Sequence, residues 1–532
     1  MNVGEAVVKL LEMYGVKAAF GIPGTHTLEY YRGLVGSSMQ HVLPRHEQGC
    51  SFAADGYARA SGEVGVCFLI AGCGLLNAST GIAAAYNDSI PMLVMSSVTN
   101  RPALNKAWGE GHELRKQTQV MECYTAFSAT AILPEDVPHL IAKAFAVFDG
   151  PRPRPVHIEI PTDVLLMDVE QETFDREWSV RRRPTLPWPN AGEIAEAARL
   201  LESAERPVIC VGGGARGAVA EVNELVAKTG ALVTHSAKGM GICPASHPQT
   251  IGSVSLECAR NEMEAADVLL VIGSELAVVD RLYAPLTPRG KMIRIDVDPI
   301  KFTDQYSAEV AINGDAAKAV RDLCAEISQP VGADKLAAAI TRADKVRAET
   351  VDVMRPIEQK YDRILKTAQS ALPSTTVYYG DMCQFSYAAL YIGQFEKPNY
   401  HYPAGLGCLG FALPAAIGGK INHPDDPVVV LIGDSGFQYT VQELATCIDE
   451  DLPLIVLVAN NFELSAIREG FDTRGIEYMA LTPTPPDHAK LAESFGWQYA
   501  GPSDHKSLTA AIEQAVASGA PTIIEIVEAD DY

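Results

Sequence analysis

Two stretches, DPVVVLIGDSG at 426–436 and LPLIVLVANN at 452–461, decide the fold. In both, apolar and β-branched residues follow one another without alternation, a pattern typical of strands covered by helices on both faces. A glycine turn and a helical pattern lie between them, which predicts a strand, a helix and a second, parallel strand. Stretches with the same character recur at 64–74, 206–214 and 266–275. The sequence therefore predicts an α/β protein built from doubly wound parallel sheets.

The size of the chain predicts several domains. It has 532 residues, of which 47% are hydrophobic and 20% are charged, and this composition excludes a disordered protein. At about 150 residues per domain, the length predicts three or four domains. Charged or proline-rich stretches at 174–190 and 328–375 divide the chain. We therefore expect three domains, each with a parallel sheet, at 1–175, 190–330 and 360–532.

Charge and cysteine usage exclude several classes of function. The formal net charge is −23, and an acidic chain repels nucleic-acid phosphates and anionic lipid. The eleven cysteines include no Cys-x-x-Cys pair and suit a reducing compartment. No apolar run approaches the roughly 20 residues that span a bilayer, and the first residues lack the pattern of a signal peptide. We expect a cytoplasmic protein without nucleic-acid or membrane partners.

Two segments of the chain share a plan. Residues 66–97 and 428–461 each contain a strand, a glycine turn, a helix and a proline that enters a second strand. The proline follows the glycine by 19 residues in the first segment and by 20 in the second. Any strand–helix–strand unit with a helix of ordinary length would give a similar spacing. The alternative is that the first and third domains are duplicated and structurally similar.

Polar residues follow the two deciding strands. Gly433, Asp434 and Ser435 form a turn that opens a helix, and Asn460 and Asn461 end the next strand. The carboxyl ends of neighbouring parallel strands meet at one edge, which is the usual ligand crevice of open α/β folds. A carboxylate, an amide oxygen and a nearby backbone carbonyl suit Mg²⁺ when phosphate oxygens complete its coordination. Taken singly, the aspartate suits a helix cap and the asparagines suit a turn; together they favour a metal–diphosphate site.

This pattern resembles a known motif. Gly-Asp-x followed by Asn-Asn at this distance is similar to the diphosphate- and Mg²⁺-binding motif of thiamine diphosphate enzymes, and the resemblance covers nearly the whole chain. It implies thiamine diphosphate and Mg²⁺ as cofactors, with Asp434, the Asn461 side chain and the Glu463 carbonyl as metal ligands. Ser435 and Glu463 stand where the family usually has glycine. At Glu463 we therefore expect an unusual backbone angle or a reoriented loop.

A second segment, HVLPRHEQGCSFAADGYARASG at 41–62, contains a candidate catalytic acid. Considered alone, Glu47 would be an acid at the start of a helix, where its charge interacts favourably with the helix dipole. The resemblance instead identifies Glu47 as the family's catalytic glutamate. That role needs a carboxyl group in an apolar pocket, where desolvation keeps it protonated enough to hydrogen-bond the pyrimidine ring of the cofactor.

The resemblance implies further cofactor contacts. They are the Gly407 carbonyl, the Leu409 side chain as an apolar wedge between the cofactor rings, Gly433, Asp434, Ser435, Asn461, Gln384, Gly72 and Asn77. Without the rest of the pattern, the stretch around Gly407 would be a glycine-rich helix start with one core leucine.

Two histidines are candidates for proton transfer at the reacting carbon. In this chemistry a 2-oxo acid loses CO₂; protonation then gives an aldehyde, whereas a second carbonyl gives carboligation. His26 follows a glycine turn, where relatives place an active-site acid, serine or histidine, and His112 lies in a polar loop. An isolated histidine is more often structural, but either residue could shuttle protons near neutral pH.

The segments GIPGTHTLEYYRGL at 21–34 and PRHEQG at 44–49 are most similar to 5-guanidino-2-oxopentanoate decarboxylases. A cationic substrate tail would need acidic residues, and Glu463, Glu469 and Asp472 are available, although they suit a solvated face equally well. The expected reaction is non-oxidative decarboxylation to an aldehyde and CO₂. The alternatives are an acetolactate-synthase-like carboligase, a 2-hydroxyacyl lyase, or a non-catalytic cofactor-binding regulator.

The resemblance also bears on assembly and on the middle domain. In relatives, the catalytic glutamate and the metal ligands meet across a subunit boundary, which implies a homodimer at minimum and favours a homotetramer. Gly212, Gly213 and Gly214 follow a strand, but such glycines alone are weak evidence for dinucleotide binding. Related middle domains hold a flavin, an adenine nucleotide or nothing, and we favour a structural role here.

Overall fold

The computed structural model describes residues 1–181, 185–528 and 532, and its chain divides into two compact units. The first unit contains Met1–Thr185, Thr375–Met382 and Gly405–Asp531, and the second contains Leu186–Ser374, Cys383–Ala404 and Tyr532. The described residues form three six-stranded sheets, and every strand pair described is parallel. The predicted α/β fold with doubly wound parallel sheets is confirmed.

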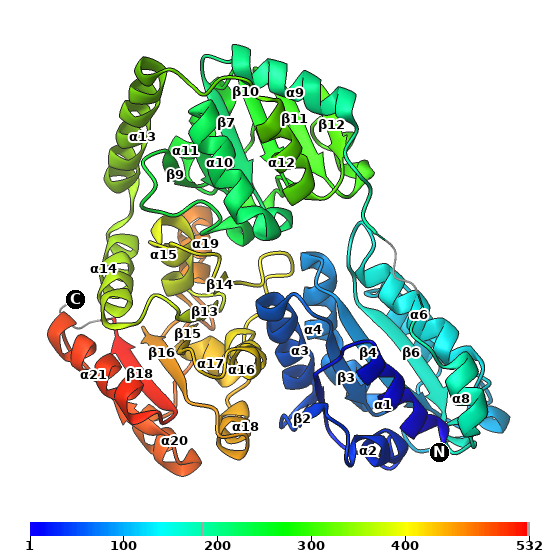
Figure 1. The fold of residues 1–532 in the computed structure, drawn as a ribbon. Coiled ribbons are helices and arrows are strands. Elements are labelled where there is room, and N and C mark those ends of the chain that lie inside the picture. Colours follow the sequence, from blue (N-terminus) through cyan, green and yellow to red (C-terminus); the bar gives the residue numbers. More distant parts are fainter. Residues whose placement is uncertain (182–184, 529–531) are drawn as a thin grey trace. The chain divides into compact units, whose positions relative to one another are not determined.

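The first sheet lies in the first unit and has the strand order β2-β1-β3-β4-β6-β5. Helices pack on both of its faces (Figure 1), which explains why its inner strands are apolar at successive positions. Its strands are β1 (Ala18–Gly21), β2 (Gln40–Val42), β3 (Gly65–Leu69), β4 (Met92–Val98), β5 (Ser128–Thr130) and β6 (Val156–Pro161). Its helices are α1 (Val3–Met13), α2 (Leu28–Leu34), α3 (Glu47–Ser61), α4 (Cys73–Asp88), α5 (Gln117–Glu122), α6 (Asp136–Phe148), α7 (Thr162–Leu165) and α8 (Gln171–Glu177).

A second sheet in this unit repeats that order, because β13-β15-β16-β18-β17 corresponds to β1-β3-β4-β6-β5. This agreement favours the duplication that the two similar segments suggested. The strands that the first unit contributes to this sheet are β13 (Val377–Gly380), β15 (Val428–Gly433), β16 (Leu454–Asn460), β17 (Gln498–Ala500) and β18 (Thr522–Val527). The helices are α16 (Ala412–Asn422), α17 (Asp434–Gln438), α18 (Glu443–Asp449), α19 (Ser465–Arg474), α20 (His488–Phe495) and α21 (His505–Ser518).

The helix expected between β15 and β16 is interrupted. It forms as two short helices, α17 and α18, rather than one. Between them, the Thr440 hydroxyl donates a hydrogen bond to the Gly410 carbonyl at 2.8 Å. Because this contact joins residues far apart in the sequence, the periodicity of the segment could not predict the break.

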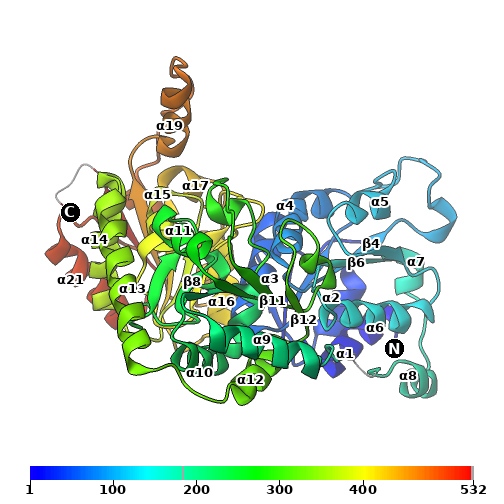
Figure 2. The same cartoon turned by 90° about the horizontal axis from the view of Figure 1, so that it is seen from above.

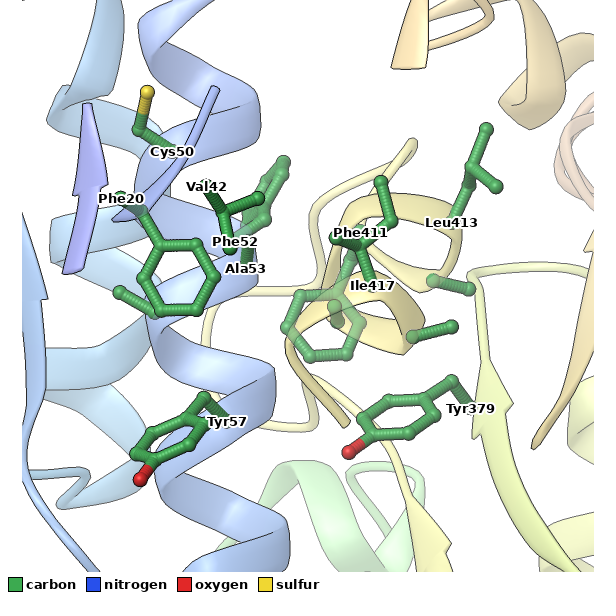
Figure 3. Close-up of a cluster of buried hydrophobic side chains, with 14 of the residues drawn as sticks. Phe20, Val42, Cys50, Phe52, Ala53, Tyr57, Tyr379, Phe411, Leu413 and Ile417 are labelled. Atoms are coloured by element: carbon green, nitrogen blue, oxygen red, sulfur yellow. The ribbon is translucent and has the colours of Figure 1, made fainter. Parts of the chain in front are cut away.

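One hydrophobic core joins the two sheets of the first unit, and helices α3 and α16 lie at its centre (Figure 3). Glycine allows their backbones to approach closely. A Cβ atom added to Gly418 would lie 1.9 Å from the Ala53 carbonyl oxygen, and one added to Gly56 would lie 2.0 Å from the Ala415 carbonyl oxygen. The phenolic hydroxyl of Tyr379, on β13, donates to the Gly56 carbonyl at 2.8 Å. The middle of α3 is therefore firmly placed relative to the sheet that contains β13.

The second unit contains the remaining sheet, with the order β12-β11-β10-β7-β8-β9. Its strands are β7 (Pro207–Val211), β8 (Leu232–His235), β9 (Thr250–Ser253), β10 (Val268–Ile272), β11 (Lys291–Asp296) and β12 (Val310–Asn313). The unit also contains α9 (Ala191–Ser203), α10 (Val219–Thr229), α11 (Glu257–Ala265), α12 (Ala316–Glu326), α13 (Ala333–Val353), α14 (Pro356–Ala371), α15 (Gln384–Ile392) and β14 (Tyr400–His401). Across the described residues, no helix combines the length and the apolar character that crossing a membrane requires.

Candidate functional site

The carboxyl ends of β15 and β16 lie side by side, because Gly433 pairs with Ala459 in the sheet register. Asp434 follows β15 directly, and the Phe462 N–H donates to Asn460 Oδ1 at 3.2 Å in the turn that follows β16. The structure therefore brings Asp434 to the turn that begins at Asn460, as the sequence spacing predicted.

The Asp434 side chain is buried, with 3% of the residue exposed. Its Oδ2 atom and the Ser435 hydroxyl have no hydrogen-bond partner among the described residues. Burial raises the pKa of Asp434, because desolvation disfavours the charged form. A buried carboxylate oxygen without a partner is costly unless a cation or a donor satisfies it. These two oxygens therefore fit a site for a hard cation and a phosphate group.

The Asn461 side chain is held in place within the turn. Its Oδ1 atom accepts the Glu463 N–H at 3.1 Å, and its Nδ2 atom donates to the Ser465 hydroxyl at 2.9 Å. A carbonyl oxygen has two lone pairs, so Oδ1 keeps one for a metal ion. No group of three His, Cys, Asp or Glu side chains suited to a metal occurs in the part of the chain described. The expected ligand set does not require one, since it has a single carboxylate.

The unusual backbone angle expected near Glu463 occurs one residue earlier. Phe462 has a φ of 59°, in the left-handed region that non-glycine residues rarely adopt. The Glu463 carboxylate pairs with Arg468 at 2.7 Å, and the Tyr478 hydroxyl donates to Asp472. Glu463 and Asp472, two of the three acids considered for a cationic substrate tail, therefore have local partners. The third acid, Glu469, also has an interaction partner. It lies on α19, a helix that has no buried residue and stands away from its sheet (Figure 2).

A buried polar network that the sequence analysis missed supports this turn. Glu525, on β18, accepts hydrogen bonds from Asn460 Nδ2 at 2.6 Å, His488 Nδ1 at 2.8 Å and the Tyr499 hydroxyl at 2.7 Å. Burial alone would raise the pKa of Glu525, but these three donors outweigh it and lower the pKa to about 2. One signal in the sequence could have indicated this network: Glu525 is the single acid within the apolar strand TIIEIV. A glutamate is almost never fully buried unless it is paired, so its position predicts buried hydrogen-bond partners.

The first sheet carries the other candidate acid. Glu47 is the first residue of α3, and Asn77 Nδ2 donates to its Oε2 atom at 2.9 Å. The side chain lies against the start of α4, since a Cβ atom added to Gly74 would be 3.3 Å from Glu47 Oε1. Gly72, which precedes α4, has a φ of 64°, and a Cβ atom there would be 2.5 Å from the His112 carbonyl oxygen. Glu47, Asn77, Gly72 and His112 therefore belong to one connected group.

The two candidate histidines are neighbours in this group. Their rings meet edge to face, with centroids 5.3 Å apart. The Nδ1 atom of His26 is buried and has no hydrogen-bond partner among the residues described. Burial, and next the nearby His112, lower the pKa of His26, although Glu110 opposes them. His112 has a φ of 60°, and its Nδ1 atom lies 3.3 Å from the Cys73 sulfur.

The remaining candidates lie in two places. Gly407, with a φ of 71°, and the half-buried Leu409 belong to a loop held by Asp381. The Asp381 carboxylate accepts backbone N–H groups of the loop at 3.0 and 3.1 Å, and burial raises its pKa to about 6. Gln384 belongs to the second unit, where its side-chain oxygen accepts a hydrogen bond from Arg355 at 3.3 Å.

Comparison with known proteins identifies matches along the chain. Residues 1–121 match the thiamine pyrophosphate enzyme N-terminal TPP binding domain, residues 194–323 match the central domain, and residues 381–526 match the C-terminal TPP binding domain. A probable 2-ketoarginine decarboxylase of Pseudomonas aeruginosa is 42% identical, over 99% of this chain and 94% of that protein. A probable acetolactate synthase large subunit of Methanocaldococcus jannaschii is 31% identical (99% and 92%), and the acetolactate synthase isozyme 2 large subunit of Escherichia coli is 30% identical (99% and 95%).

Proposed function

This chain belongs to the thiamine pyrophosphate enzyme family, and from that premise we propose that it is a thiamine diphosphate- and Mg²⁺-dependent decarboxylase of a 2-oxo acid. The products would be an aldehyde and CO₂. The observation that carries the choice of reaction is the full-length identity of 42% with a probable 2-ketoarginine decarboxylase, against 30–32% with several acetolactate synthases.

Thiamine diphosphate supplies, when bound, the carbon nucleophile that attacks the oxo group and the electron sink that allows CO₂ to leave. In the proposal, Mg²⁺ is held by Asp434, the Asn461 amide oxygen and the Glu463 carbonyl oxygen. The unpartnered Asp434 Oδ2 and Ser435 hydroxyl support this assignment, because both are hard oxygen donors. Gly433 leaves the backbone of the turn unobstructed for the diphosphate.

Glu47 would hold and exchange one proton with the pyrimidine ring, and Asn77 would orient it through the 2.9 Å hydrogen bond to Oε2. Glu47→Gln should still bind the cofactor but lose most activity, since an amide can hydrogen-bond but cannot exchange the proton. Near-normal turnover in this variant would remove Glu47 from the mechanism. Gly72 and Gly407 would allow close approach to the cofactor, with Leu409 between its rings and Gln384 at the diphosphate.

His26 and His112 would move protons at the reacting carbon. The lowered pKa of His26 keeps its ring neutral at neutral pH. Its unpartnered Nδ1 atom is then available to exchange a proton with substrate. His112, held edge to face against that ring, would complete the relay and shape the pocket around the substrate carbonyl.

The proposed substrate is 5-guanidino-2-oxopentanoate, which is 2-ketoarginine. The test is CO₂ release from a panel of 2-oxo acids with added thiamine diphosphate and Mg²⁺, including pyruvate and 2-oxopentanoate as uncharged controls. We expect the guanidino acid to have the highest kcat/KM, and its product to be the aldehyde. Equal rates for all three acids would contradict the substrate assignment without contradicting the reaction.

A carboligase is the second candidate, because the acetolactate synthases match almost the entire chain. Incubation with pyruvate distinguishes the two reactions, since a carboligase gives an acyloin and a decarboxylase gives acetaldehyde. Calorimetry with thiamine diphosphate, with and without Mg²⁺, tests the cofactors separately from the reaction. Absence of binding would contradict both candidates.

We also propose a homodimer at minimum, and a homotetramer, in which Glu47 and Asp434 of different subunits serve one cofactor. The domain limits we propose are 1–175, 190–330 and 360–532; within the last range, residues 529–531 lie outside the described residues. Sedimentation velocity in the presence of cofactor tests the assembly. A fully active monomer would contradict it.

A further inference from the structure

The turn that leads into α3 rests on helix α18. Glu443, in the first turn of α18, is completely buried. Its two carboxylate oxygens accept the Arg45 N–H at 3.0 and 3.2 Å. The Thr446 hydroxyl donates to its Oε2 atom at 2.7 Å. The backbone N–H of Arg45, two residues before Glu47, is therefore satisfied by a side chain of α18.

Gly49 makes room for this carboxylate. A Cβ atom added there would lie 2.3 Å from Glu443 Oε1, so any larger residue at position 49 would displace the acid. The first turn of a helix has unsatisfied N–H groups and a partial positive charge, which favour a carboxylate beside it. Burial raises the pKa of Glu443, and the N–H of Arg45 opposes this shift.

The neighbouring contacts are weaker. Glu450 Oε1, at the end of α18, accepts the Leu43 N–H at 3.3 Å and is only partly buried. Asp449 pairs with the Arg45 guanidinium, but 49% of the Asp449 side chain is exposed. Surface ion pairs of this kind contribute little. Of these three acids, Glu443 is thus the fully buried one, and it accepts a backbone N–H closer to Glu47 than the one that Glu450 accepts.

We propose that Glu443 is a positioning residue for Glu47: it holds the 43–46 turn and the first turn of α3 so that the Glu47 carboxyl group has one fixed direction. This inference rests on the proposed function of Glu47. Glu443 lies nine residues after Asp434, so a single short segment connects the proposed metal site with the acid.

The test compares Glu443→Gln with Glu450→Gln, which changes the same functional group at the residue that caps the other end of α18. The first measurement is amide hydrogen exchange of Arg45 without cofactor. We expect at least tenfold faster exchange in Glu443→Gln, because the glutamine offers one acceptor oxygen instead of two. In Glu450→Gln, the exchange of the Arg45 amide should remain as in the unmodified protein.

The second set of measurements uses the holoenzyme and records C2 deuterium exchange and kcat. In Glu443→Gln, deuterium exchange of the thiazolium C2 proton and kcat should fall together by about 10- to 100-fold, because a small misplacement of a catalytic group has an effect of this size. The dissociation constant of thiamine diphosphate and KM should change less than twofold. Adding Glu443→Gln to Glu47→Gln should slow C2 exchange no further, since the acid to be positioned is already absent.

Several results would overturn the inference. They are unchanged amide exchange in Glu443→Gln, faster amide exchange with normal C2 exchange, or a loss of cofactor affinity as large as the loss of rate. If Glu443→Gln fails to fold, Gly49→Ala displaces the same carboxylate, and normal C2 exchange in that variant would overturn the inference equally. If Glu47→Gln alone leaves C2 exchange unchanged, the proposed role of Glu47 fails. That single variant therefore distinguishes a failure of the proposed function from a failure of the positioning role of Glu443.

Discussion

The close approach of α3 and α16 gives a prediction whose size follows from the structure. In Gly418→Ala, the new Cβ atom would lie 1.9 Å from the Ala53 carbonyl oxygen and 2.7 Å from the Tyr57 nitrogen. Both atoms belong to the backbone of α3, so no side chain can turn away. Real Cβ atoms essentially never come within 3.0 Å of such neighbours, and the two helices must therefore separate by more than 1 Å within a filled core (Figure 3).

Two effects oppose each other in this variant. Alanine is more favourable than glycine in a helix by about 1 kcal/mol. Overpacking a filled core costs about 1–3 kcal/mol, and a backbone clash belongs at the upper end of that range. The net loss of about 2 kcal/mol should lower the thermal midpoint of the first unit, which contains both helices, by about 3 °C, since the entropy of unfolding is about 2 cal/mol/K per residue. Because Glu47 begins α3, a displacement of about 1 Å should also lower kcat by about 100-fold.

The assay is differential scanning calorimetry together with kcat at saturating cofactor. Gly217→Ala is the control, because a Cβ atom at Gly217 meets no atom within 4 Å, and it should leave both quantities unchanged. Gly56→Ala introduces the matching clash from α3, at 2.0 Å from the Ala415 carbonyl oxygen, and the losses in the double variant should be less than additive. A midpoint that rises in Gly418→Ala, with normal kcat, would refute the argument.

Three further predictions concern the site. Asp434→Asn should raise the Mg²⁺ concentration needed for half-maximal activity at least tenfold, measured by titration of the metal-free enzyme; an unchanged titration would exclude Asp434 as a ligand. Glu525, with its pKa lowered to about 2, contributes stability that is complete above its unfolded pKa of about 4.3 and is lost as the pH falls through about 2. Glu525→Gln should therefore be less stable by about 2 kcal/mol at pH 7, with a smaller difference at pH 3, and an equal difference at both pH values would contradict this. His26→Asn should lower kcat by about 100-fold and remove the acidic limb of the kcat/KM profile, which lies below 6.5 because the pKa of His26 is lowered; a persisting limb would assign it to another group.

The sequence was sufficient to predict several central strands, because each of these is a run of apolar residues bounded by a turn. The runs at 206–214, 266–275, 426–436 and 452–461 contain β7, β10, β15 and β16. The neighbourhood of Asp434 and the asparagine turn was predictable for the same reason, since adjacent parallel strands bring their ends together. Local pattern alone could not predict the division of the expected helix into α17 and α18, which accompanies a contact between Thr440 and Gly410.

The supporting residues of the site were not predictable in this way. Glu443 lies in the stretch TVQELATC, where it suits an ordinary helical acid, and only the fold brings the 43–46 turn to it. Glu525 becomes significant only when β18 is placed beside β16, because that pairing brings it to Asn460. Gln384, predicted from resemblance, falls in the second unit and hydrogen-bonds Arg355 there, so its cofactor contact remains a proposal.

Glycines within α3 and α16 explain how the sequence allows these two helices to pack closely. A glycine inside a helix costs about 1 kcal/mol relative to alanine, yet Gly56 lies within α3 and Gly418 lies within α16. Neither has the positive φ that would require glycine, so backbone conformation does not explain them. Each glycine faces the backbone of the other helix, and a Cβ atom added to either would lie about 2 Å from a carbonyl oxygen of that helix. The glycines therefore lower the intrinsic stability of both helices but allow a short distance between α3 and α16. Because Glu47 is the first residue of α3, that distance determines where the proposed catalytic acid lies.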